Sequence, residues 1–367
     1  MNQKLEGILK IKFRLIIKLL FVTLILSSIY SCKKEKPDPI QTYKKQDGVF
    51  ICNEGNFTFG NATLSFFDPN KKEIFNQVFI NANSFPVGDI LQSVSVFEKK
   101  AYLLVNNSGK ILIINADDFT HQGTISGLVS PRYMVFVNSE KAFVSDLYSK
   151  SISIINPTTL EITGNINIGC SSEQMIIIDD YLYVTSWSYN NKLFKININN
   201  HSITDSLDLQ MQPNSLVKDK NNKLWVLCDG GIDGQAGLSK INPANMDIEK
   251  NFLFSGTQNS PTELKINGSG DSLFYINSSW NTSQSISGNG ICIMSIEDES
   301  LPTSTIIPEQ NRLFFALGID PISSIVYISD AKDFMQKGWI FRYKPSGEII
   351  DSFKVDIVPG DFCFKTK

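Results

Sequence analysis

Short apolar runs recur along the chain from residue 48 onward, and polar turn residues separate them. One block spans 131–168, where four runs read PRYMVFV, AFVSD, SISIIN and ITGNINI. Runs of five to seven residues that are rich in Val, Ile, Tyr and Phe, and bounded by Asn, Asp, Gly and Pro, predict β-strands. No long window outside the first 31 residues has a convincing helical period. The pattern therefore predicts an all-β protein.

The second run of each block contains an aromatic residue, and these aromatic residues mark a repeat. They are Phe50, Tyr102, Phe143, Tyr183, Trp225, Phe274 and Tyr327. Successive members lie 52, 41, 40, 42, 49 and 53 residues apart. A unit of four strands and about 40 residues is the size of a propeller blade. Seven such units predict a seven-bladed β-propeller over residues 48–367, with four strands in each blade.

The two ends of this region are complementary parts of one blade. The first run, VFICN (49–53), has no inner strand before it, and the last run, GDFCFK (360–365), has no blade after it. We therefore expect the C-terminal strand to join the N-terminal blade and close the ring without a free edge. That pairing places Cys52 and Cys363 on neighbouring strands. The cysteines lack CxxC spacing, so buried free thiols are favoured over a disulfide or a zinc site.

The loops fall into two classes. Turns between the third and fourth strands, such as NPTTL (156–160), are short and contain the residues that backbone geometry requires. Loops between the second and third strands are longer, as in NEGNFTFGN (53–61), DGGIDGQAG (229–237) and NSSWNTSQSISGNG (277–290). A hairpin needs only two to five linking residues. Because the extra length carries aromatic, amide and carboxylate side chains, we predict that these loops form a ligand-binding face.

The candidate ligand-binding residues belong to these loops and to one connection between blades on the same face. They are Asn53, Phe57, Asn106, Arg132, Asp146, Tyr148, Trp187, Tyr189, Asp229, Asn277, Trp280 and Asp330. For the small polar residues that open each loop, the alternative is that they cap the backbone of the loop. Arg132 either reaches the central mouth or pairs with a neighbouring carboxylate. Trp187 and Trp280 fit capping poorly, because an indole ring contributes little to a turn.

The N-terminal 47 residues differ in composition from the repeats. A basic start and a 12-residue apolar run precede Cys32, which predicts a signal peptide over residues 1–31 that is too short to span a membrane. A cysteine at the cleavage point predicts lipidation of Cys32, with ordinary secretion as the alternative. Residues 32–47 contain two prolines and few apolar side chains, which predicts a flexible tether. The lysines at 33, 34 and 36 leave open whether an outer-membrane lipoprotein faces the cell surface or the periplasm.

Charge and motifs argue against several classes of function. The first 31 residues hold 5 of the 34 basic and 1 of the 37 acidic residues, so the remainder has a net charge near −7 and no basic surface for nucleic acid. Motifs of serine hydrolases, zinc proteases and nucleotide-binding proteins are absent, and no catalytic residue, metal or cofactor is predicted. One enzymatic alternative stays open, namely hydrolysis by carboxylates near the axis, and its candidates are Glu54, Asp146, Asp229, Asp233 and Asp330.

Four segments resemble a known family. ICNEGNFTFGNATLSFFDP (51–69), SPRYMVFV (130–137) and SDLYSKSISIINP (145–157) resemble the YncE-like propeller lipoproteins of Bacteroidetes. YLYVTSWS (181–188) is similar to the YVTN-type repeat of bacterial surface propellers, with Ser186 in place of the usual Asn. One branch of the family, the BtuG-type lipoproteins, captures cobalamin and passes it to a TonB-dependent outer-membrane transporter.

The resemblance implies a lipid-anchored binding protein rather than an enzyme. Its implied ligand is a corrinoid or a similarly bulky nutrient, and its implied partner is a TonB-dependent transporter. The alternative is a surface propeller that binds a protein or a glycan. A third interpretation is a propeller lactonase or a quinoprotein-like enzyme. The two histidines, His121 and His201, lie outside the long loops, which argues against the third interpretation.

Overall fold

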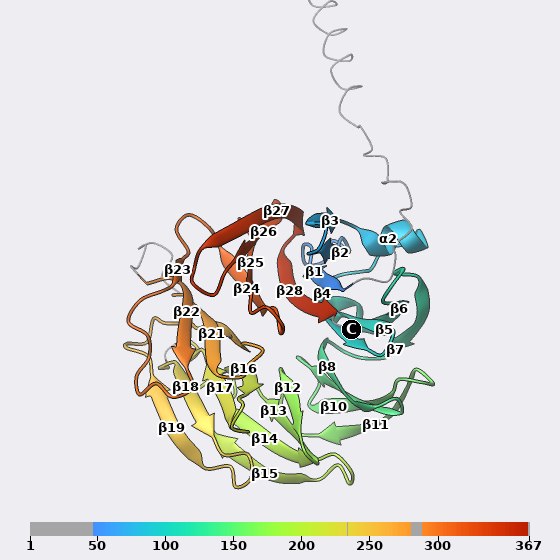
Figure 1. Ribbon diagram of the computed structural model, residues 1–367. Coiled ribbons are helices and arrows are strands. Elements are labelled where there is room, and N and C mark those ends of the chain that lie inside the picture. The colour runs from blue at the N-terminus through green and yellow to red at the C-terminus, as the bar shows by residue number, and fades with distance from the viewer. Residues whose placement is uncertain (1–46, 233, 280–287, 366–367) are drawn as a thin grey trace, which may run out of the picture. The chain divides into compact units, whose positions relative to one another are not determined.

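The computed structural model describes residues 47–232, 234–279 and 288–365. Seven four-stranded antiparallel sheets surround a common axis as the blades of a propeller (Figure 1). The predicted seven-bladed β-propeller is therefore confirmed. The predicted signal peptide, Cys32 and all of the predicted tether except Asp47 lie outside the described residues.

Blades 2 to 7 each contain four strands that follow one another in the chain. In each of these blades the first strand lies nearest the axis and the fourth lies outermost. Blades 2 to 4 contain β4 (Leu91–Phe97), β5 (Lys100–Val105), β6 (Lys110–Asn115), β7 (His121–Ser126), β8 (Pro131–Asn138), β9 (Lys141–Asp146), β10 (Ser151–Asn156), β11 (Glu161–Asn167), β12 (Met175–Ile178), β13 (Tyr181–Thr185), β14 (Lys192–Asn197) and β15 (Ile203–Asp208). Blades 5 to 7 contain β16 (Pro213–Lys218), β17 (Leu224–Cys228), β18 (Gly237–Ile241), β19 (Ile248–Leu253), β20 (Thr262–Ile266), β21 (Ser272–Asn277), β22 (Gly290–Ser295), β23 (Ile307–Pro308), β24 (Phe314–Ile319), β25 (Val326–Asp330), β26 (Lys337–Tyr343) and β27 (Ile349–Ile357).

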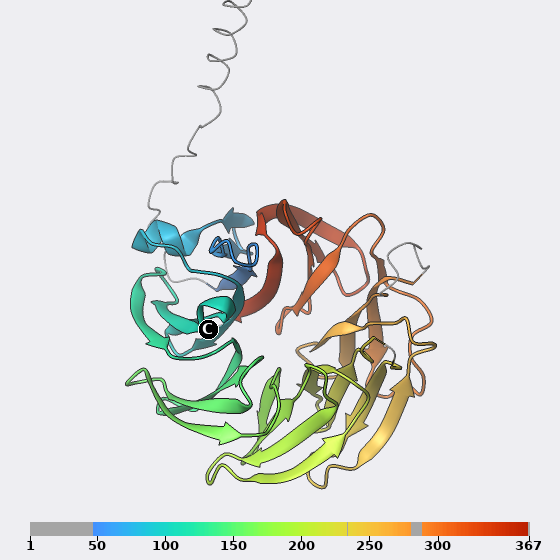
Figure 2. The same cartoon turned by 180° about the vertical axis from the view of Figure 1, so that it is seen from behind.

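Blade 1 closes the ring, because its innermost strand comes from the C-terminus. It contains β28 (Pro359–Lys365), β1 (Gly48–Asn53), β2 (Thr63–Asp68) and β3 (Glu73–Phe75). Phe50 of β1 lies opposite Cys363 of β28, and Cys52 lies opposite Asp361. The expected closure is thus confirmed, and Cys52 and Cys363 are free thiols. Each innermost strand contacts the innermost strand of the next blade around the whole ring, as both views show (Figures 1 and 2).

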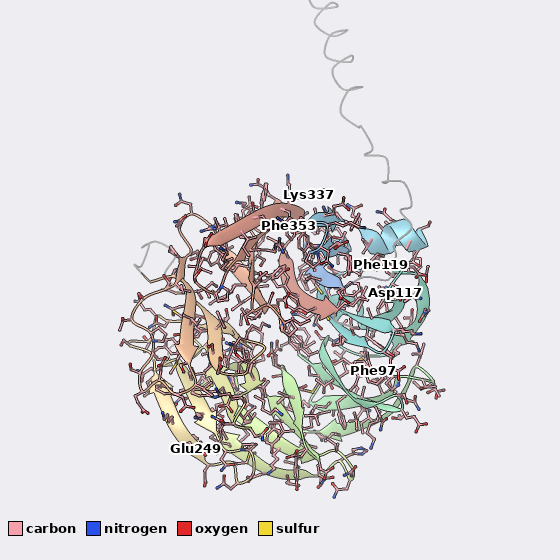
Figure 3. The ribbon with its side chains drawn as sticks, viewed as in Figure 1. Phe97, Asp117, Phe119, Glu249, Lys337 and Phe353 are labelled. Atoms are coloured by element: carbon pink, nitrogen blue, oxygen red, sulfur yellow. The ribbon has the colours of Figure 1, made fainter. Side chains whose placement is uncertain are left out.

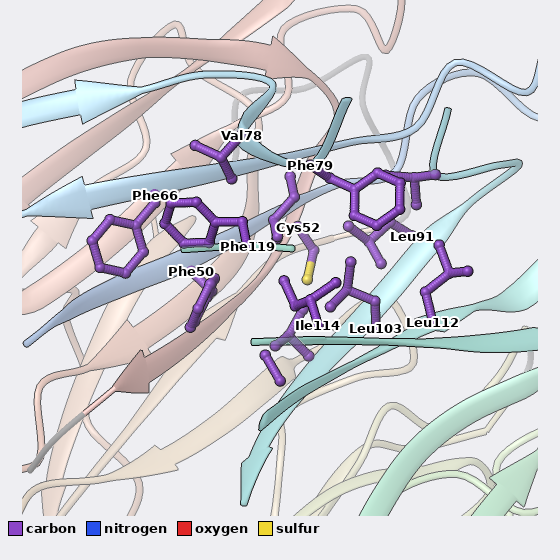
Figure 4. Packing of buried hydrophobic residues seen from close by; sticks show 14 of the residues in the cluster. Phe50, Cys52, Phe66, Val78, Phe79, Leu91, Leu103, Leu112, Ile114 and Phe119 are labelled. Atoms are coloured by element: carbon purple, nitrogen blue, oxygen red, sulfur yellow. The ribbon is translucent and has the colours of Figure 1, made fainter. Parts of the chain in front are cut away.

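The core lies between neighbouring blades, where side chains fill the spaces that the ribbon leaves (Figure 3). All seven aromatic residues that mark the repeat are at most 2% exposed. Between blades 1 and 2, the ring of Phe50 packs edge-on against Phe66, with 5.1 Å between ring centroids, and against Phe119 (Figure 4). Burying one such side chain contributes roughly 1.5–3 kcal/mol, so the repeated aromatic position stabilises every interface in the ring.

Two short helical segments depart from the all-strand pattern. Helix α2 (Val78–Asn83) follows β3, and its Val78 and Phe79 are buried in the cluster between blades 1 and 2. A 3₁₀ turn, η1 (Asn106–Ser108), lies in the loop between β5 and β6. Within residues 47–232, 234–279 and 288–365, neither segment has the length and apolar content needed to cross a bilayer.

Candidate functional site

The long loops and the starts of the inner strands lie on one face of the ring. Asn53, Asp146 and Asp330 end second strands, and each of them pairs with the first residue of an inner strand. The loops that leave these second strands therefore surround the same end of the axis at which the inner strands begin. We call this end of the ring the loop face.

Most inner strands begin with an irregularity in register. The pairing shifts near the start of β4, β8, β16, β20 and β24, and at the corresponding end of the β1–β28 pair. A bulge of this kind re-aims the side chains around it. Here it accompanies a group of polar side chains at the loop-face end of the axis, which we call the axial cluster. Its members are Glu54, Gln92, Arg132, Tyr133, Glu173, Glu263, Lys265 and Asp361.

Arg132 joins three neighbouring blades within the axial cluster. Its Nη2 lies 2.6 Å from Oε1 of Glu173 and its Nε lies 2.9 Å from Oε2, so the pair is bidentate. Arg132 also donates a hydrogen bond to the side-chain carbonyl of Gln92, and its guanidinium lies 5.9 Å from the Trp187 ring. Of the two sequence-based alternatives for Arg132, the pairing with a neighbouring carboxylate is observed, and a part in ligand binding at the mouth stays a prediction.

Glu54 and Asp361 form the acidic part of the axial cluster. Burial raises the pKa of Glu54 to about 7, against the opposing attraction of Arg132. Burial likewise raises the pKa of Asp361 to about 7, while Lys265 opposes the shift and Glu263 adds to it. The two carboxyls also repel each other, and the Glu54 carboxylate lies where a Cβ on Gly360 would collide with it. Near neutral pH the mouth therefore contains two carboxyl groups that are poised to gain or lose a proton.

Exposed apolar side chains lie in the loops between second and third strands on the loop face. We call them the apolar rim, and they are Phe57, Phe59, Tyr148, Tyr189, Ile232, Phe334 and Met335. Phe57, Tyr148 and Tyr189 were predicted from the sequence, and they are 65%, 73% and 82% exposed. Loops of different blades are tied together here, because Asn56 Nδ2 donates a hydrogen bond to the carbonyl of Phe334 at 2.6 Å. A single exposed apolar residue is ordinary, but a group around one mouth is typical of a binding surface.

The aspartates that open three of the loops bind backbone amides. Asp146 accepts hydrogen bonds from the backbone N–H groups of Tyr148 (3.0 Å), Ser149 (2.8 Å) and Ser130 (2.8 Å). Asp330 accepts from the N–H of Lys332 at 2.9 Å. These contacts match the capping alternative, and a part in ligand binding stays a prediction for both residues.

Asp229 combines a cap with a contact between blades. Its carboxylate accepts a hydrogen bond from the N–H of Gly231 at 2.9 Å and another from Nε1 of Trp187, also at 2.9 Å. The indole ring of Trp187 therefore bridges the loops of blades 4 and 5 beside the guanidinium of Arg132. This contact orients the ring of Trp187 at the edge of the axial cluster.

The three candidate asparagines are also turned toward protein groups. Asn53 donates to Ser65 Oγ at 2.9 Å, Asn106 to the carbonyl of Pro131 at 3.2 Å, and Asn277 to the carbonyl of Gly288 at 3.0 Å. Trp280 and Asp233 lie outside the described residues. Of the candidates, the structure brings Arg132 and Trp187 together at the mouth and places Phe57, Tyr148 and Tyr189 on the rim.

We expect Asp146→Ala to lower the free energy of unfolding by about 1–3 kcal/mol, because Asp146 is only 2% exposed and the backbone N–H groups that it binds lose their acceptor. Tyr148→Ala, two residues away and 73% exposed, is expected to change it by at most about 0.5 kcal/mol. Urea denaturation of both variants measures the difference. An Asp146→Ala variant as stable as Tyr148→Ala would show that the cap contributes nothing to the fold.

Five charged or amide members of the axial cluster were not identified from the sequence. They are Gln92, Glu173, Glu263, Lys265 and Asp361. Aligning the inner strands gives a signal for two of them: Glu263 and Asp361 lie within the Pro-x-x-apolar starts PTEL (261–264) and PGDF (359–362), as Arg132 lies within PRYM (131–134). Gln92 and Glu173 have no such Pro before them. Among the described residues, no group of three or more His, Cys, Asp or Glu side chains is placed to hold a metal ion.

Solved structures with similar folds belong to proteins with different names and activities. A quinoprotein alcohol dehydrogenase-like protein of Bacteroides thetaiotaomicron is 16% identical over 87% of this chain and 78% of its own, with a TM-score of 0.66. A periplasmic gluconolactonase of Pseudomonas aeruginosa is 11% identical over 87% and 99%, with a TM-score of 0.64. Hydrazine synthase of Kuenenia stuttgartiensis is 11% identical over 72% and 85%, with a TM-score of 0.59. At such identities the likeness shows the fold alone.

A family model covers nearly all of the propeller. No curated protein matches the sequence. The resemblance to YncE-like and BtuG-type lipoproteins stays a prediction. The matching family model, described as a domain of unknown function (DUF5074), spans residues 47–361. The chain therefore belongs to the DUF5074 family.

Proposed function

We propose that the protein is a binding protein that captures a bulky ligand on the loop face. The observation that carries this proposal is the combination of the apolar rim with the axial cluster around one mouth. A ligand site typically surrounds a few fixed polar groups with apolar and aromatic side chains. The rim offers large aromatic surfaces, and Arg132, Glu54 and Asp361 offer polar contacts at its centre. A ligand with an extended body and several polar groups fits this arrangement.

The ligand and partner in this proposal come from the resemblance. A corrinoid carries several amide groups on a broad ring system, and a TonB-dependent transporter would receive it from the protein. β1 begins at Gly48, at the end opposite Asn53, so the chain enters blade 1 on the side of the ring opposite the loop face. Lipidation at Cys32 would therefore leave the loop face free. The 15 residues 33–47 span at most about 50 Å, which lets the loop face reach a neighbouring transporter.

Calorimetric titration of cyanocobalamin into the purified protein tests the proposal. We expect one-to-one binding that Tyr189→Ala weakens at least about fivefold, because loss of an aromatic anchor of a binding surface commonly costs more than 1 kcal/mol. The matched control is Ile322→Ala. Ile322 is 81% exposed, like Tyr189, but lies in the turn between β24 and β25 on the opposite face.

Two results would change the proposal in different ways. Binding that neither Tyr189→Ala nor Trp187→Ala weakens would remove the loop face as the site. No heat at micromolar protein would remove the corrinoid, and capture of a protein or glycan partner on the loop face would then be tested with the same variants.

A second function is favoured by the pKa values of about 7 at Glu54 and Asp361. One such carboxyl in its ionised form can take a proton from water, and the other in its protonated form can donate one to a leaving oxygen. Water attack on a lactone carbonyl would use both steps, and a gluconolactonase shares the fold. Turnover of aldonolactones that Glu54→Gln abolishes would establish this activity. Equal turnover by the wild type and Glu54→Gln would exclude this role for Glu54.

A further inference from the structure

A second concavity lies on the loop face, away from the axial cluster, at the seam where blade 7 meets blade 1. We call it the seam cleft. Its volume is about 370 Å³, and its walls come from the start of β2, helix α2 with the residues that follow it, and the adjacent ends of β26 and β27. Small-molecule sites typically occupy about 300–1,000 Å³. No residue of the axial cluster or of the apolar rim lines the seam cleft.

The α2 insertion makes this concavity possible. β3 ends after three residues, and α2 then takes the chain across the outside of blade 1 (Figure 1). Two contacts hold the helix in place. Val78 and Phe79 are buried, and Asn83 Nδ2 donates a hydrogen bond to the carbonyl of Phe119 at 2.9 Å. Ile80, on the other side of the helix, remains 37% exposed and lines the seam cleft. The helix thus contributes the side chain of Ile80 to the wall of the seam cleft.

The lining combines apolar side chains with one ion pair. Ile80, Pro86 and Ile357 supply accessible apolar surface. Asp356 is already satisfied, because its carboxylate accepts from Thr63 Oγ1 at 2.9 Å and lies 3.1 Å from Lys337 Nζ. Its side chain is only 7% exposed, whereas that of Lys337 is 43% exposed. An ammonium has three donors, so Lys337, beside blade 1 in Figure 3, can still bind an anion at the cleft.

We propose that the seam cleft binds a small monocarboxylate with an apolar chain. The carboxylate accepts hydrogen bonds from Lys337 Nζ, and the chain lies against Ile80, Pro86 and Ile357. The ammonium of Lys337 disfavours a cationic ligand. With a neutral ligand, the remaining N–H donors of Lys337 would stay bound to water. The seam cleft is separate from the mouth at which the proposed function places its ligand. The two proposals can therefore be tested independently.

Titration of octanoate, octanamide and octylamine into the purified protein, below their micellar concentrations, tests the charge preference. We expect octanoate to bind at least about tenfold more tightly than octanamide, and octylamine to bind more weakly than both. Hexanoate should bind roughly fifteenfold more weakly than octanoate, because each buried methylene contributes about fourfold in affinity.

Variants of Lys337 assign the preference to this site. Lys337→Gln is expected to remove the advantage of octanoate over octanamide, while Lys337→Arg keeps it. Lys344→Gln is the matched control, because Lys344 also pairs with a carboxylate, Glu348, but in a turn on the opposite face. Ile80→Trp places a larger side chain in the cleft and is expected to abolish octanoate binding.

Three outcomes would overturn the proposal. Octanoate and octanamide could bind equally, the preference could survive Lys337→Gln, or none of the probes could bind. In the last case the seam cleft would serve a protein side chain rather than a free carboxylate. Cyanocobalamin titration of Ile80→Trp separates the two sites, since it is expected to match the wild type whether or not octanoate binds.

Discussion

Arg132→Leu is expected to lower the free energy of unfolding by about 3–5 kcal/mol, because it leaves the carboxylate of Glu173 buried without its partner. The Glu173 side chain is 5% exposed, and both of its oxygens accept hydrogen bonds from Arg132. Leu cannot replace these donors, and the side-chain carbonyl of Gln92 loses a donor as well. Urea denaturation followed by circular dichroism measures the loss.

Two controls separate the burial of the pair from its charge. The double variant Arg132→Leu/Glu173→Leu removes both charges and is expected to recover most of the stability, since an apolar pair of similar volume commonly replaces a buried ion pair without loss. Lys192→Leu breaks an ion pair with Asp208 whose side chains are 38% and 64% exposed, and it should cost at most about 1 kcal/mol. If Arg132→Leu costs no more than Lys192→Leu, the axial pair does not stabilise the ring.

The fold could be predicted because its determinants are local and repeated. The strands are short apolar or alternating runs, the turns use residues suited to their backbone, and the aromatic of the second strand recurs from Phe50 to Tyr327. Closure by β28 followed from the incomplete first and last units. Helix α2 was missed because six residues are too few to show a helical period. Burial of Val78 and Phe79, which depends on blade 2, fixes it instead.

The axial cluster could be predicted only in part, because its contacts join residues that the ring alone brings together. Arg132 and Glu173 are 41 positions apart in sequence and meet through neighbouring inner strands. Glu263 and Asp361 stand at the starts of strands, where a polar residue also fits an ordinary loop end. For Asp146 and Asp330 the residue type indicated a hydrogen-bonding role but could not distinguish a backbone amide from a ligand.

The free energy of unfolding is expected to fall by about 3 kcal/mol for each of two carboxyl groups of the axial cluster as pH rises from about 4 to about 8. In the folded protein the pKa values of Glu54 and Asp361 are raised to about 7 from ordinary values of 4.5 and 3.8. The folded state therefore keeps protons that the unfolded chain releases within this interval. The stabilisation is complete below the ordinary pKa values and is lost as pH passes through about 7.

Amide variants assign this pH dependence to the axial cluster. Glu54→Gln and Asp361→Asn keep the shape of each side chain but remove its charge, so each is expected to be more stable than the wild type at pH 8 and to show a smaller slope with pH. Asp271 and Asp333 do not contribute in this interval, because hydrogen bonds, led by those from the side chains of Asn267 and Gln336, lower their pKa values to about 2.

Urea denaturation from pH 4 to pH 8 measures the slopes. A wild-type protein that is equally stable at both ends would mean that water or a cation stabilises the charged carboxylates, and the mouth would then be open to a cationic group of the ligand.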